Sequence, residues 1–560
     1  MKKFSAKSIG MIAASAALVA VTGGVALTAA HPSQPTNTAK RTSAPKRTSG
    51  IYTKPLVIGG SVSGNIQDNF SPFQGSADLG TYGIIYQPLF YFDNISGHTF
   101  GFLGQSYKWS NGNKTLTVNL RKNVKWSDGK PFSSADVVFT YDLLKKYPAL
   151  DLNGVWTQLS SVTAHGPDQV VFQFKHVDVP YITYVLGVYI VPQHIWAKLG
   201  NPTTVTVTHP VGTGPYELSS FNPQVYYMKA NPYYYLGNPK VKTLEITSYT
   251  GNTSADLALA KGQIDWGGSF IPGIQKVYAS KSPYNKYWFP PTGITTLYPN
   301  LKDPLLGNLA VRQAISMAIN RQIIYKEGEY GYEPPANPAG LILPNDANWL
   351  DPALKNTKYN YNPAAAVKIL EKAGFKKNAQ GIFQSPSGKP LSFTIQVVTG
   401  WTDWDMDCQL IANELKQVGI NVQVQEEQYG TYYANLKTHK FQLAVSWVGT
   451  GPTPYYTFQQ MLAPNGGWNI EQWSNPATTN ALNKFALTTN VAQQKRDLYV
   501  LENAMVKQLP TIPLVYGANW YEYNTQHVAG WPTPQDPYVN PATFAGPATA
   551  IVLMHLHAAN

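Results

Sequence analysis

Cysteine is almost absent from this sequence. Among 560 residues the only one is Cys408, so no disulfide can form within the chain. No Cys-X-X-Cys pair is present to hold zinc or to exchange disulfides. Stability must therefore come from packed cores, and a content of 43% hydrophobic and 13% aromatic residues is typical of a folded protein.

Acidic residues are scarce as well. The chain has 31 Asp and Glu against 43 Lys and Arg, and charged residues make up 13% of it, where about 25% is usual for soluble domains. Basic residues form a run only in KRTSAPKR, residues 40–47, within a segment rich in Ser, Thr and Pro. Without a basic patch that includes aromatic residues, we expect no nucleic-acid partner. A shortage of carboxylates fits acidic surroundings, where ion pairs are lost to protonation.

The motifs of common enzymes are missing. The sequence contains no G-x-S-x-G, no H-E-x-x-H and no G-x-x-x-x-G-K, which argues against common hydrolases and nucleotide enzymes. VGTGPYEL, residues 211–218, is rich in glycine but has no lysine and no following helix, so it indicates a tight turn before a strand. DWDMDCQLIANE, residues 403–414, spaces its acids as a calcium loop does, yet Cys408 stands where glycine is needed. These acids suit the first turn of a helix.

Histidine offers no better metal site. The ten histidines are scattered along the chain. His555 and His557 would share one face of a strand, but a pair at a chain end with no third ligand indicates two surface residues. We predict no metal, no cofactor and no catalytic residue.

Residues 1–30 are typical of an export signal. Lys2, Lys3 and Lys7 precede an apolar, Ala-rich run over residues 9–27, and residues 28–30 are small enough for cleavage. An uncleaved membrane anchor is the alternative, because the run approaches the ~20 residues that span a bilayer. Residues 31–51 are rich in Pro, Thr, Ser and Lys and predict a disordered spacer. We expect an exported protein, extracellular or on the outer face of the cytoplasmic membrane.

Strand-like runs alternate with amphipathic segments from residue 52 onward. Alternation with period two predicts strands over residues 115–126 and 169–176. Ser133 or Ser134 can cap a helix, and the clearest helix covers residues 308–328. Residues 362–375 predict another, with Asn362 as its cap, Pro363 at its first position and Gly374 at its end. A strand, a helix and a strand surround Gly419. This alternation predicts an α/β fold.

Six blocks of sequence, taken in order, carry a family resemblance. They are WSDGKPFSSADVVFTYDLL (126–144), PVGTGPYELSSFNPQVYYMKANPYYY (210–235), DLALAKGQIDW (256–266), NLAVRQAISMAINRQIIYK (308–326), NPAAAVKILEKAGF (362–375) and LPTIPLVY (509–516). In order and spacing they resemble the extracellular solute-binding proteins of the oligopeptide/dipeptide-binding family, the substrate-binding proteins of ABC transporters in family 5. The resemblance covers essentially the whole chain after the leader.

The resemblance implies an α/β clamp of two lobes that binds a solute and delivers it to the permease of an ABC importer. The first lobe would comprise residues 52–91, 206–296 and 520–560, with an extra subdomain, residues 92–205, inserted into it. The second lobe would comprise residues 297–519. The ligand would lie between the lobes, and hinge closure would bury it, which requires no catalytic group. The family also suggests a monomer.

The stretch SWVGTGPTPYYTF, residues 446–458, bears on the ligand, because it holds four aromatic residues and no charge. In peptide-binding relatives, the loop that corresponds to it carries an aspartate that pairs with the α-amino group of the ligand. That carboxylate is missing here, and a buried ammonium without a partner costs several kcal/mol. Trp447, Tyr455 and Tyr456 instead offer rings with polar tips, which suit an oligosaccharide.

Further residues complete the predicted ligand site. NFSPF (69–73) and GQIDWGGSFIP (262–272) resemble family members that bind cello- or xylo-type oligosaccharides. The predicted ligand-binding residues are Asn69, Phe70, Trp266, Phe270, Trp401, Asp403, Trp404, Trp447, Tyr455, Tyr456 and Trp520. For any single aromatic residue, burial in the core is the alternative. The ligand can also be an oligopeptide, whose ammonium would then pair with Asp403 or Asp405.

Two other classes of protein stay open. A secreted glycoside- or peptide-processing enzyme would need paired carboxylates in the cleft, and their separation in space cannot be read from sequence. A nickel or haem scavenger, known among relatives, would need clustered histidines, which this chain does not show.

Overall fold

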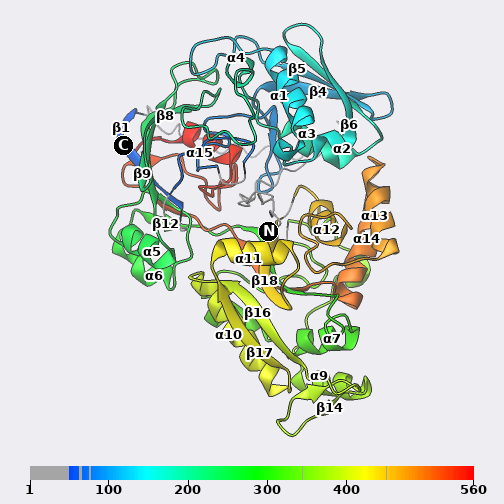
Figure 1. Cartoon of the computed structure of the whole chain (residues 1–560). Coiled ribbons are helices and arrows are strands. Elements are labelled where there is room, and N and C mark those ends of the chain that lie inside the picture. Colours follow the sequence, from blue (N-terminus) through cyan, green and yellow to red (C-terminus); the bar gives the residue numbers. More distant parts are fainter. Residues whose placement is uncertain (1–49, 62–65, 75–76, 344, 450, 560) are drawn as a thin grey trace, which may run out of the picture.

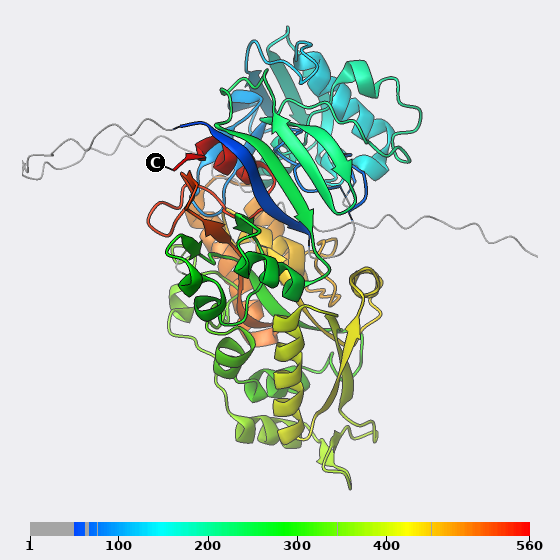
Figure 2. The same cartoon turned by 90° about the vertical axis from the view of Figure 1, so that its left-hand side faces the viewer.

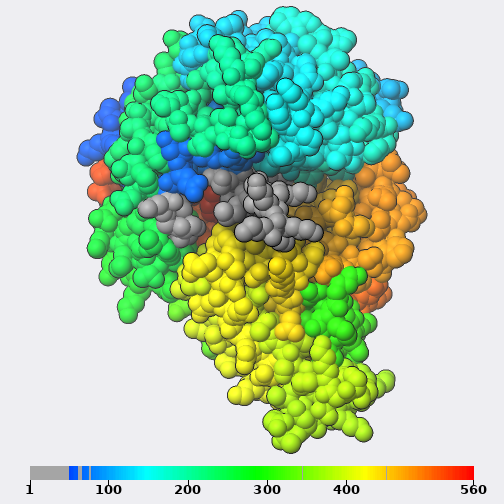
Figure 3. Space-filling view, viewed as in Figure 1, coloured from blue at the N-terminus to red at the C-terminus, as the bar shows by residue number. Residues whose placement is uncertain are grey.

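The computed structural model describes residues 50–61, 66–74, 77–343, 345–449 and 451–559. The predicted leader, residues 1–30, and all but the end of the predicted spacer, residues 31–51, lie outside these ranges. The described residues form two lobes, one above the other in Figure 1. In the space-filling view, the blue, cyan and green first lobe lies above the mostly yellow and orange second lobe (Figure 3). The predicted α/β clamp of two lobes is confirmed.

The first lobe contains a seven-stranded sheet whose strands come from distant parts of the chain. Its order is β12-β20-β11-β1-β10-β9-β8. β1 runs parallel to β10 and β11, and the other pairs are antiparallel. Figure 2 shows β1, in blue, beside the green strands of this sheet. The strands are β1 (Tyr52–Ser61), β8 (Tyr216–Asn222), β9 (Val225–Ala230), β10 (Val241–Ser248), β11 (Trp266–Gly267), β12 (Asn285–Tyr287) and β20 (Glu522–Asn524).

A four-stranded antiparallel sheet forms the inserted subdomain. Its strands, in the order β4-β5-β7-β6, are β4 (Gly104–Ser110), β5 (Thr115–Leu120), β7 (Gln169–Phe174) and β6 (Leu159–Ala164). Leu56 of β1, Leu116 of β5 and Val552 belong to one continuous apolar core, so the subdomain is packed onto the lobe rather than tethered to it. The remaining strands here are β2 (Phe90–Phe92), β3 (Thr99–Gly101), β21 (Val528–Ala529) and β22 (His557–Ala558).

The helices of the first lobe are mostly short. They are α1 (Ser134–Lys146), α2 (Val155–Gln158), α3 (Ile182–Leu186), α4 (Gln193–Trp196), α5 (Asn252–Ala260), α6 (Ile274–Val277) and α15 (Pro547–His555). Ser133 caps α1, because its hydroxyl accepts a hydrogen bond from the N–H of Ala135, as the sequence predicts. His555 ends α15 and His557 begins β22, so the prediction that they share one strand face is wrong. The leucine after His555 leaves the helix for an extended conformation.

The second lobe has a five-stranded sheet with an apolar core on each face. The sheet has the order β17-β16-β18-β13-β19. Along β18, Leu443 and Val445 belong to one core, whereas Ala444 and Val448 belong to the other, as the period of a strand requires. The strands are β13 (Pro291–Pro299), β16 (Ser392–Val398), β17 (Asn421–Glu427), β18 (Leu443–Gly449) and β19 (Ile512–Ala518), with a separate pair, β14 (Lys376–Lys377) and β15 (Phe383–Gln384).

Helices cover both faces of this sheet. α7, α9 and α10 contribute to one core, and α11 to α14 contribute to the other. The helices are α7 (Leu309–Ala318), α8 (Arg321–Ile323), α9 (Pro363–Lys372), α10 (Thr402–Gln417), α11 (Tyr429–Lys437), α12 (Tyr455–Leu462), α13 (Pro476–Ala486) and α14 (Val491–Gln508). None of the helices within the described ranges combines the length and the apolar character needed to cross a bilayer.

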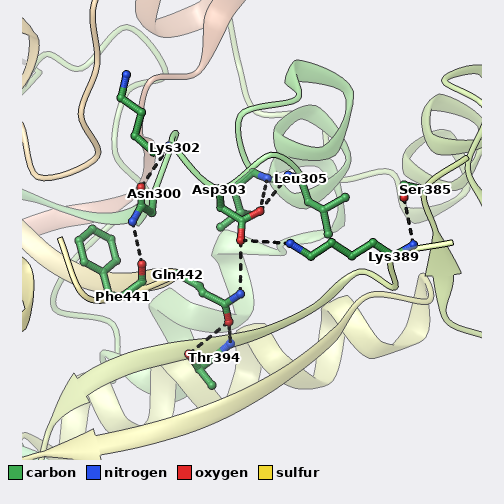
Figure 4. A network of polar contacts seen from close by, with 10 residues as sticks. Asn300, Lys302, Asp303, Leu305, Ser385, Lys389, Thr394, Phe441 and Gln442 are labelled. Atoms are coloured by element: carbon green, nitrogen blue, oxygen red, sulfur yellow. Dashed lines mark hydrogen bonds and ion pairs between the residues drawn. The ribbon is translucent and has the colours of Figure 1, made fainter. Parts of the chain in front are cut away.

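Polar contacts tie the loop after β13 to the sheet (Figure 4). Asp303 accepts a hydrogen bond from the N–H of Leu305 at 2.8 Å and from the side-chain amide of Gln442 at 3.4 Å. The amide oxygen of Gln442 accepts in turn from the N–H of Thr394 on β16, at 3.0 Å. These contacts hold the start of the second lobe against its central strands.

The predicted helix over residues 308–328 is wrong in its length. α7 ends at Ala318, since Ile319 is extended, and Asn320 then caps the short helix α8 by accepting from the N–H of Gln322. The segment ends in a π-helical turn, Ile324–Gly328. The prediction for residues 362–375 is confirmed, because Asn362 accepts from the N–H of Ala365 and Gly374 takes a φ of +87°.

Two extended segments join the lobes. Residues 288–290 connect β12 to β13, and residues 519–521 connect β19 to β20. The segments are hydrogen bonded to each other, since the N–H of Asn519 donates to the carbonyl of Pro290 at 2.9 Å and that of Trp288 donates to the carbonyl of Tyr521 at 3.0 Å. The residue boundaries predicted for the lobes and the subdomain stay predictions.

Candidate functional site

Two adjoining cavities lie between the lobes. The first cavity has a volume of about 300 Å³ and the second about 730 Å³. Trp447 and Gly449, at the end of β18, line both of them. The prediction treated the stretch 446–458 as one loop. It consists instead of the end of strand β18, a short segment over residues 451–454 and the start of helix α12.

A cluster of tryptophans from three elements surrounds the junction of the cavities. Trp401 precedes α10, Trp404 lies in its first turn, and Trp447 lies on β18. The ring centroid of Trp447 is 5.9 Å from that of Trp401, 5.6 Å from Trp404 and 5.3 Å from Trp468. Such rings offer broad apolar faces together with indole N–H donors, which suits a ligand with both apolar and polar faces.

Aromatic residues of the first lobe, and Trp520 from a segment that joins the lobes, also line the first cavity. Trp520, in the connection between β19 and β20, packs edge-to-face on Phe270 at 5.3 Å and on Phe289 at 4.9 Å. Phe544 and Tyr91 also line this cavity. Because the two sets of rings belong to different lobes, their separation depends on how the lobes sit on each other.

Neutral polar groups fill the spaces between these rings. They belong to Asn94, Asn252, Ser269, Thr292, Thr295, Asn519 and Asn540. Asn519 donates from its side-chain amide to that of Asn540 at 2.7 Å, which fixes the orientation of both. Amides and hydroxyls of this kind orient a ligand by hydrogen bonds without adding charge.

Two buried carboxyl groups also line the first cavity. Asp403 lies in the first turn of α10 and is 7% exposed, and Glu333 lies between the π-helical turn Ile324–Gly328 and α9 and is 3% exposed. One oxygen of Glu333 accepts a hydrogen bond from the N–H of Ala518 at 2.5 Å. The other oxygen of Glu333 and Oδ1 of Asp403 have no hydrogen-bond partner among the described residues.

Burial keeps these two groups from ionising readily. It raises the pKa of Asp403 to about 6, although backbone N–H groups at the start of α10 counteract the rise. It raises the pKa of Glu333 well above its usual range; the N–H of Ala518 and the hydroxyl of Thr295 oppose this rise, and the negative charges of Asp403 and Asp407 add to it. In the folded protein each of these carboxyls is therefore favoured in its protonated form unless a positively charged partner stabilises the carboxylate.

More carboxyl groups surround this pair. Glu329 and Asp407 are also buried, and burial holds the pKa of each well above its usual range. The charges of Glu333, Asp407 and Asp403 add to the rise for Glu329, and the charge of Asp403 adds to the rise for Asp407. Asp256 and Glu522, from the first lobe, lie near Ser269 on the other side, and the charge of Asp403 reaches Asp256. Among the described residues that line the first cavity, none is Lys, Arg or His.

The second cavity is more polar and carries one cation. Lys437 donates to the carbonyl of Gly467, and its ammonium lies 4.8 Å from the ring centroid of Trp468. Burial lowers the pKa of Lys437. The tyrosines that line this cavity are Tyr82, Tyr181, Tyr184, Tyr189, Tyr433 and Tyr455. Asp178 lines it too, and burial raises the pKa of this carboxyl to about 7.

The structure brings most of the predicted site residues together. Phe270, Trp401, Asp403, Trp404, Trp447 and Trp520 line the first cavity, and Trp447 and Tyr455 line the second. Asp405 lines neither cavity, although it directly follows Trp404 of the tryptophan cluster in α10. Contact of these residues with a ligand stays a prediction.

Four of the predicted residues lie outside both cavities. Asn69 donates to the side chain of Gln74, and the ring of Phe70 packs on that of Tyr226. The buried indole of Trp266 donates to the carbonyl of Pro541 at 3.0 Å. Tyr456 connects the lobes, because its hydroxyl donates to the carbonyl of Pro180 at 2.8 Å.

Several residues that line the first cavity were not predicted from the sequence. Glu333 follows a π-helical turn in a segment without a motif, so nothing in its neighbours points to the cavity. Thr295 lies inside strand β13, and nothing in the sequence distinguishes it from other strand residues. Asn519 could have been found, since it immediately precedes Trp520 at the predicted boundary between the lobes.

No cluster of three or more His, Cys, Asp or Glu side chains is placed to hold a metal ion within the described ranges. The candidate site is built from aromatic rings, neutral polar groups and carboxyls, together with Lys437 in the second cavity.

Comparison with known proteins identifies relatives of the whole clamp. Residues 101–469 match the family model described as bacterial extracellular solute-binding proteins, family 5 Middle. A putative ABC transporter peptide-binding protein of Brucella ovis is 26% identical over 475 residues, which cover 79% of this chain and 84% of the relative. The oligopeptide-binding protein AppA of Bacillus subtilis is 26% identical over 389 residues, which cover 65% of this chain and 68% of the relative.

Solved structures agree with this assignment. The mannohexaose-bound periplasmic oligopeptide-binding protein of an oligopeptide ABC transporter from Thermotoga maritima superposes with a TM-score of 0.83 at 28% identity. The superposition covers 90% of this chain and 98% of that one. AppA of Bacillus subtilis in complex with a nonapeptide superposes with a TM-score of 0.76 at 21% identity, covering 92% of this chain and 100% of that one, which shows a shared fold.

Proposed function

Because the chain belongs to the bacterial extracellular solute-binding proteins of family 5, we propose that it captures an oligosaccharide or an oligopeptide in the two joined cavities and delivers it to a membrane permease. Its coarser role is that of the substrate-binding component of an ABC transporter. The observation that carries the proposal is the placement of Trp447 in the wall of both cavities, so that one elongated ligand can pass along its ring.

An oligosaccharide is the ligand class that the aromatic walls favour. A pyranose ring has an apolar face that stacks on indole, and hydroxyls that pair with amides and carboxyls. The first cavity supplies both kinds of group from both lobes. The Thermotoga maritima neighbour is described as mannohexaose bound, which supports the same class.

An oligopeptide is favoured by a different observation. Glu333 and Asp403 offer carboxyl oxygens without partners in the first cavity, and a peptide has an ammonium group at one end. Asp403 would then take over the role of the aspartate that is missing from the stretch 446–458. Relatives described as peptide-binding support this class.

Capture proceeds by hinge closure in this proposal. Residues 288–290 and 519–521 are the hinge, because these segments alone join the two large sheets among the described residues. Contacts between the lobes, such as the bond from Tyr456 to Pro180 and that from the N–H of Ile274 to the hydroxyl of Tyr332, 2.9 Å, would break on opening. A ligand that touches both lobes therefore shifts the population towards the closed state. No catalytic group takes part.

The export signal, the permease partner and a monomeric state belong to this proposal as well. A binding protein that presents its ligand to a permease acts outside the cytoplasmic membrane, which agrees with the lysines and the apolar run of residues 1–30.

A thermal-shift screen tests the proposal. The full chain is heated with cello-, xylo- and manno-oligosaccharides and with mixed di- to pentapeptides. A ligand at about a hundred times its dissociation constant adds about 2.7 kcal/mol to the free energy of unfolding, and the unfolding temperature rises accordingly. A flat response to every oligomer, or breakdown of an oligomer by the protein, would contradict the proposal.

A further inference from the structure

We propose that the lower end of the second lobe is a docking surface for an anionic lipid bilayer. This surface, the basic tip, consists of Lys368 and Lys372 of α9 and of Lys376 and Lys377 of β14. Figure 1 shows α9 and β14 at the end of the second lobe that points away from the first lobe. The inference goes beyond the proposed function, because it concerns where the chain is held and not which ligand it captures.

The positive charge of the chain is concentrated in two segments. Residues 352–400 contain seven lysines and one acidic residue, Glu371, whereas residues 1–49 contain seven Lys and Arg and no acidic residue. The other 462 residues contain 29 of the 43 basic residues and 30 of the 31 acidic ones, so together they are almost neutral. Within the part of the chain that the structure describes, the segment 352–400 therefore carries the excess of positive charge.

The four lysines of the basic tip are presented by an ordered scaffold. All four are exposed, and none of them forms an ion pair with another described residue. Lys376 is opposite Gln384 in the pairing of β14 with β15. The ring of Phe383 in β15 is buried in a core of the second lobe, and its N–H donates to the carbonyl of Gly419 at 2.8 Å. Lys416, near the end of α10, is a further exposed cation three residues before Gly419.

Stabilisation of the helix explains only part of this arrangement. Lys372 lies in the last turn of α9, where a cation interacts favourably with the helix dipole, but Lys376 and Lys377 lie beyond the helix. Lys368 and Lys372 are four residues apart on α9, so their like charges repel each other. Glu371 is the one acidic residue near them in the sequence, and an anionic surface would remove the repulsion that it leaves.

A bilayer fits the chemistry of the basic tip better than a small anion or a specific protein partner does. Bidentate recognition of a carboxylate or a phosphate is typical of arginine, and the segment 352–400 contains no arginine. None of the four lysines lines either cavity between the lobes, so these cavities do not offer them an enclosed anion. A lysine ammonium is a point charge that suits a diffuse layer of anionic headgroups, where each lysine raises the binding constant about fivefold.

Docking through the basic tip leaves the candidate ligand site accessible. The two cavities lie between the lobes, whereas the basic tip lies at the far end of the second lobe (Figure 1). A chain of a family described as extracellular meets the outer face of the membrane. Attraction by several lysines would concentrate the chain at that face, and salt would weaken the attraction.

Quenching of a fluorophore by labelled lipid tests the docking surface. One full chain carries the fluorophore at Ala379→Cys, in the exposed turn between β14 and β15, and another carries it at Ala164→Cys, on β6 of the first lobe. The natural Cys408 is buried, so the fluorophore attaches at the new position. Vesicles of phosphatidylcholine, with or without phosphatidylglycerol, carry a quencher on the headgroup. We expect quenching at residue 379 by vesicles that contain phosphatidylglycerol, much less at residue 164, and loss of the difference in about 0.5 M salt.

Two variants of equal charge separate the basic tip from the net charge of the chain. The first replaces the four lysines of the basic tip by Gln. The second makes the same change at four exposed lysines of the first lobe, Lys54, Lys108, Lys114 and Lys198. Both keep the leader and lose the same charge. We expect the first variant to need about tenfold more phosphatidylglycerol, or more, for half-maximal quenching at residue 379, and the second to match the unaltered chain. Equal unfolding temperatures show that both variants keep the fold.

Three outcomes would overturn the docking surface. Equal quenching at residues 379 and 164, or equal effects of the two variants, would assign the attraction to the leader or to the net charge. Equal quenching by vesicles with and without phosphatidylglycerol would exclude an electrostatic surface. Binding of soluble polyphosphate that the first variant loses, without quenching by vesicles, would assign the tip to an anionic polymer instead. None of these measurements uses a captured ligand, so the proposed function is tested separately.

Discussion

Among the described residues of the cleft, Trp447 alone both packs on three other tryptophan rings and lines both cavities. Its ring lies within 6 Å of the rings of Trp401, Trp404 and Trp468, and it lines both cavities. Its strand, β18, is the central strand of the five-stranded sheet, so its position is fixed by the core of the second lobe. A rigid ring in this place can act as a platform along which successive units of a ligand lie.

Replacing Trp447 by Ala should therefore weaken ligand binding, and it should also lower the unfolding temperature because the ring packs on three other tryptophans. We expect a loss of about 2 kcal/mol in binding free energy, roughly thirtyfold in affinity, as for a central aromatic residue of an interface. Titration calorimetry with the ligand found in the screen measures this loss.

Trp109→Ala provides the matched control. Trp109 is half-buried in the inserted subdomain, where its ring packs on Phe174 at 5.0 Å, and it lines neither cavity. It should lower the unfolding temperature and leave the affinity unchanged. A full affinity for the ligand in Trp447→Ala would remove Trp447 from the site.

Asparagine caps most of the helices of the second lobe. Asn308, Asn362, Asn475 and Asn490 cap α7, α9, α13 and α14 through their side-chain oxygens, and Asn320 caps α8. An amide oxygen accepts the same hydrogen bonds as a carboxylate but does not titrate. The caps therefore hold at any pH, which agrees with the shortage of carboxylates in the sequence.

The variant Asn362→Asp turns this cap into a pH-dependent one. At neutral pH the aspartate should match or exceed the asparagine, because negative charge suits the start of a helix. Below about pH 4 the carboxyl becomes protonated, and we expect a loss of about 1 kcal/mol relative to the unaltered chain. Chemical unfolding at pH 7 and at pH 3 measures the difference. Equal stabilities at pH 3 would show that the cap does not depend on an ionised acceptor.

The local sequence pattern was sufficient to predict helices whose two ends carry recognisable capping residues. Asn362, Pro363 and Gly374 mark α9 at both ends, and the helix is found between them. The helix predicted over residues 308–328 failed because its apolar repeat continues through Asn320, where a new cap starts another helix. The apolar repeat shows which side of a helix is buried, but it does not show where one helix ends and the next begins.

Residues of the site were predictable only where a ring or a family block marked them. The tryptophans were found because aromatic side chains in uncharged stretches are distinctive. Glu333 was not found, since its role depends on a cavity formed by β13, β19 and α10, which are far apart in sequence. Phe70 and Trp266 show the converse, because an aromatic residue in a family block can belong to the core.

The whole molecule holds many of its few carboxyls in buried positions. Burial raises the pKa of Asp78, Asp178 and Asp346 to about 7 and that of Glu502 to about 8. Glu471 and Glu522 are shifted in the same direction by the same cause. Because burial favours the protonated form of these carboxyls, the folded state should be more stable under mildly acidic than under alkaline conditions.

Stability should therefore fall as the pH rises. Each of these groups has a higher pKa in the folded chain than the value of about 4 that it has when unfolded. Its contribution to the free energy of unfolding is complete below pH 4 and is lost as the pH rises through about 7 to 8. We expect the unfolding temperature to drop by several degrees between pH 5 and pH 8.5. A temperature that rises over this interval would contradict the protonated state of these carboxyls.

Closure of two lobes on an oligomeric ligand is the central claim, and small-angle X-ray scattering tests it most directly. The full chain is measured alone and with the ligand identified in the screen at saturating concentration. We predict that the radius of gyration falls and that the scattering curve approaches the one calculated from the structure of Figure 1. An identical scattering curve with and without a ligand that calorimetry shows to be bound would contradict capture by hinge closure.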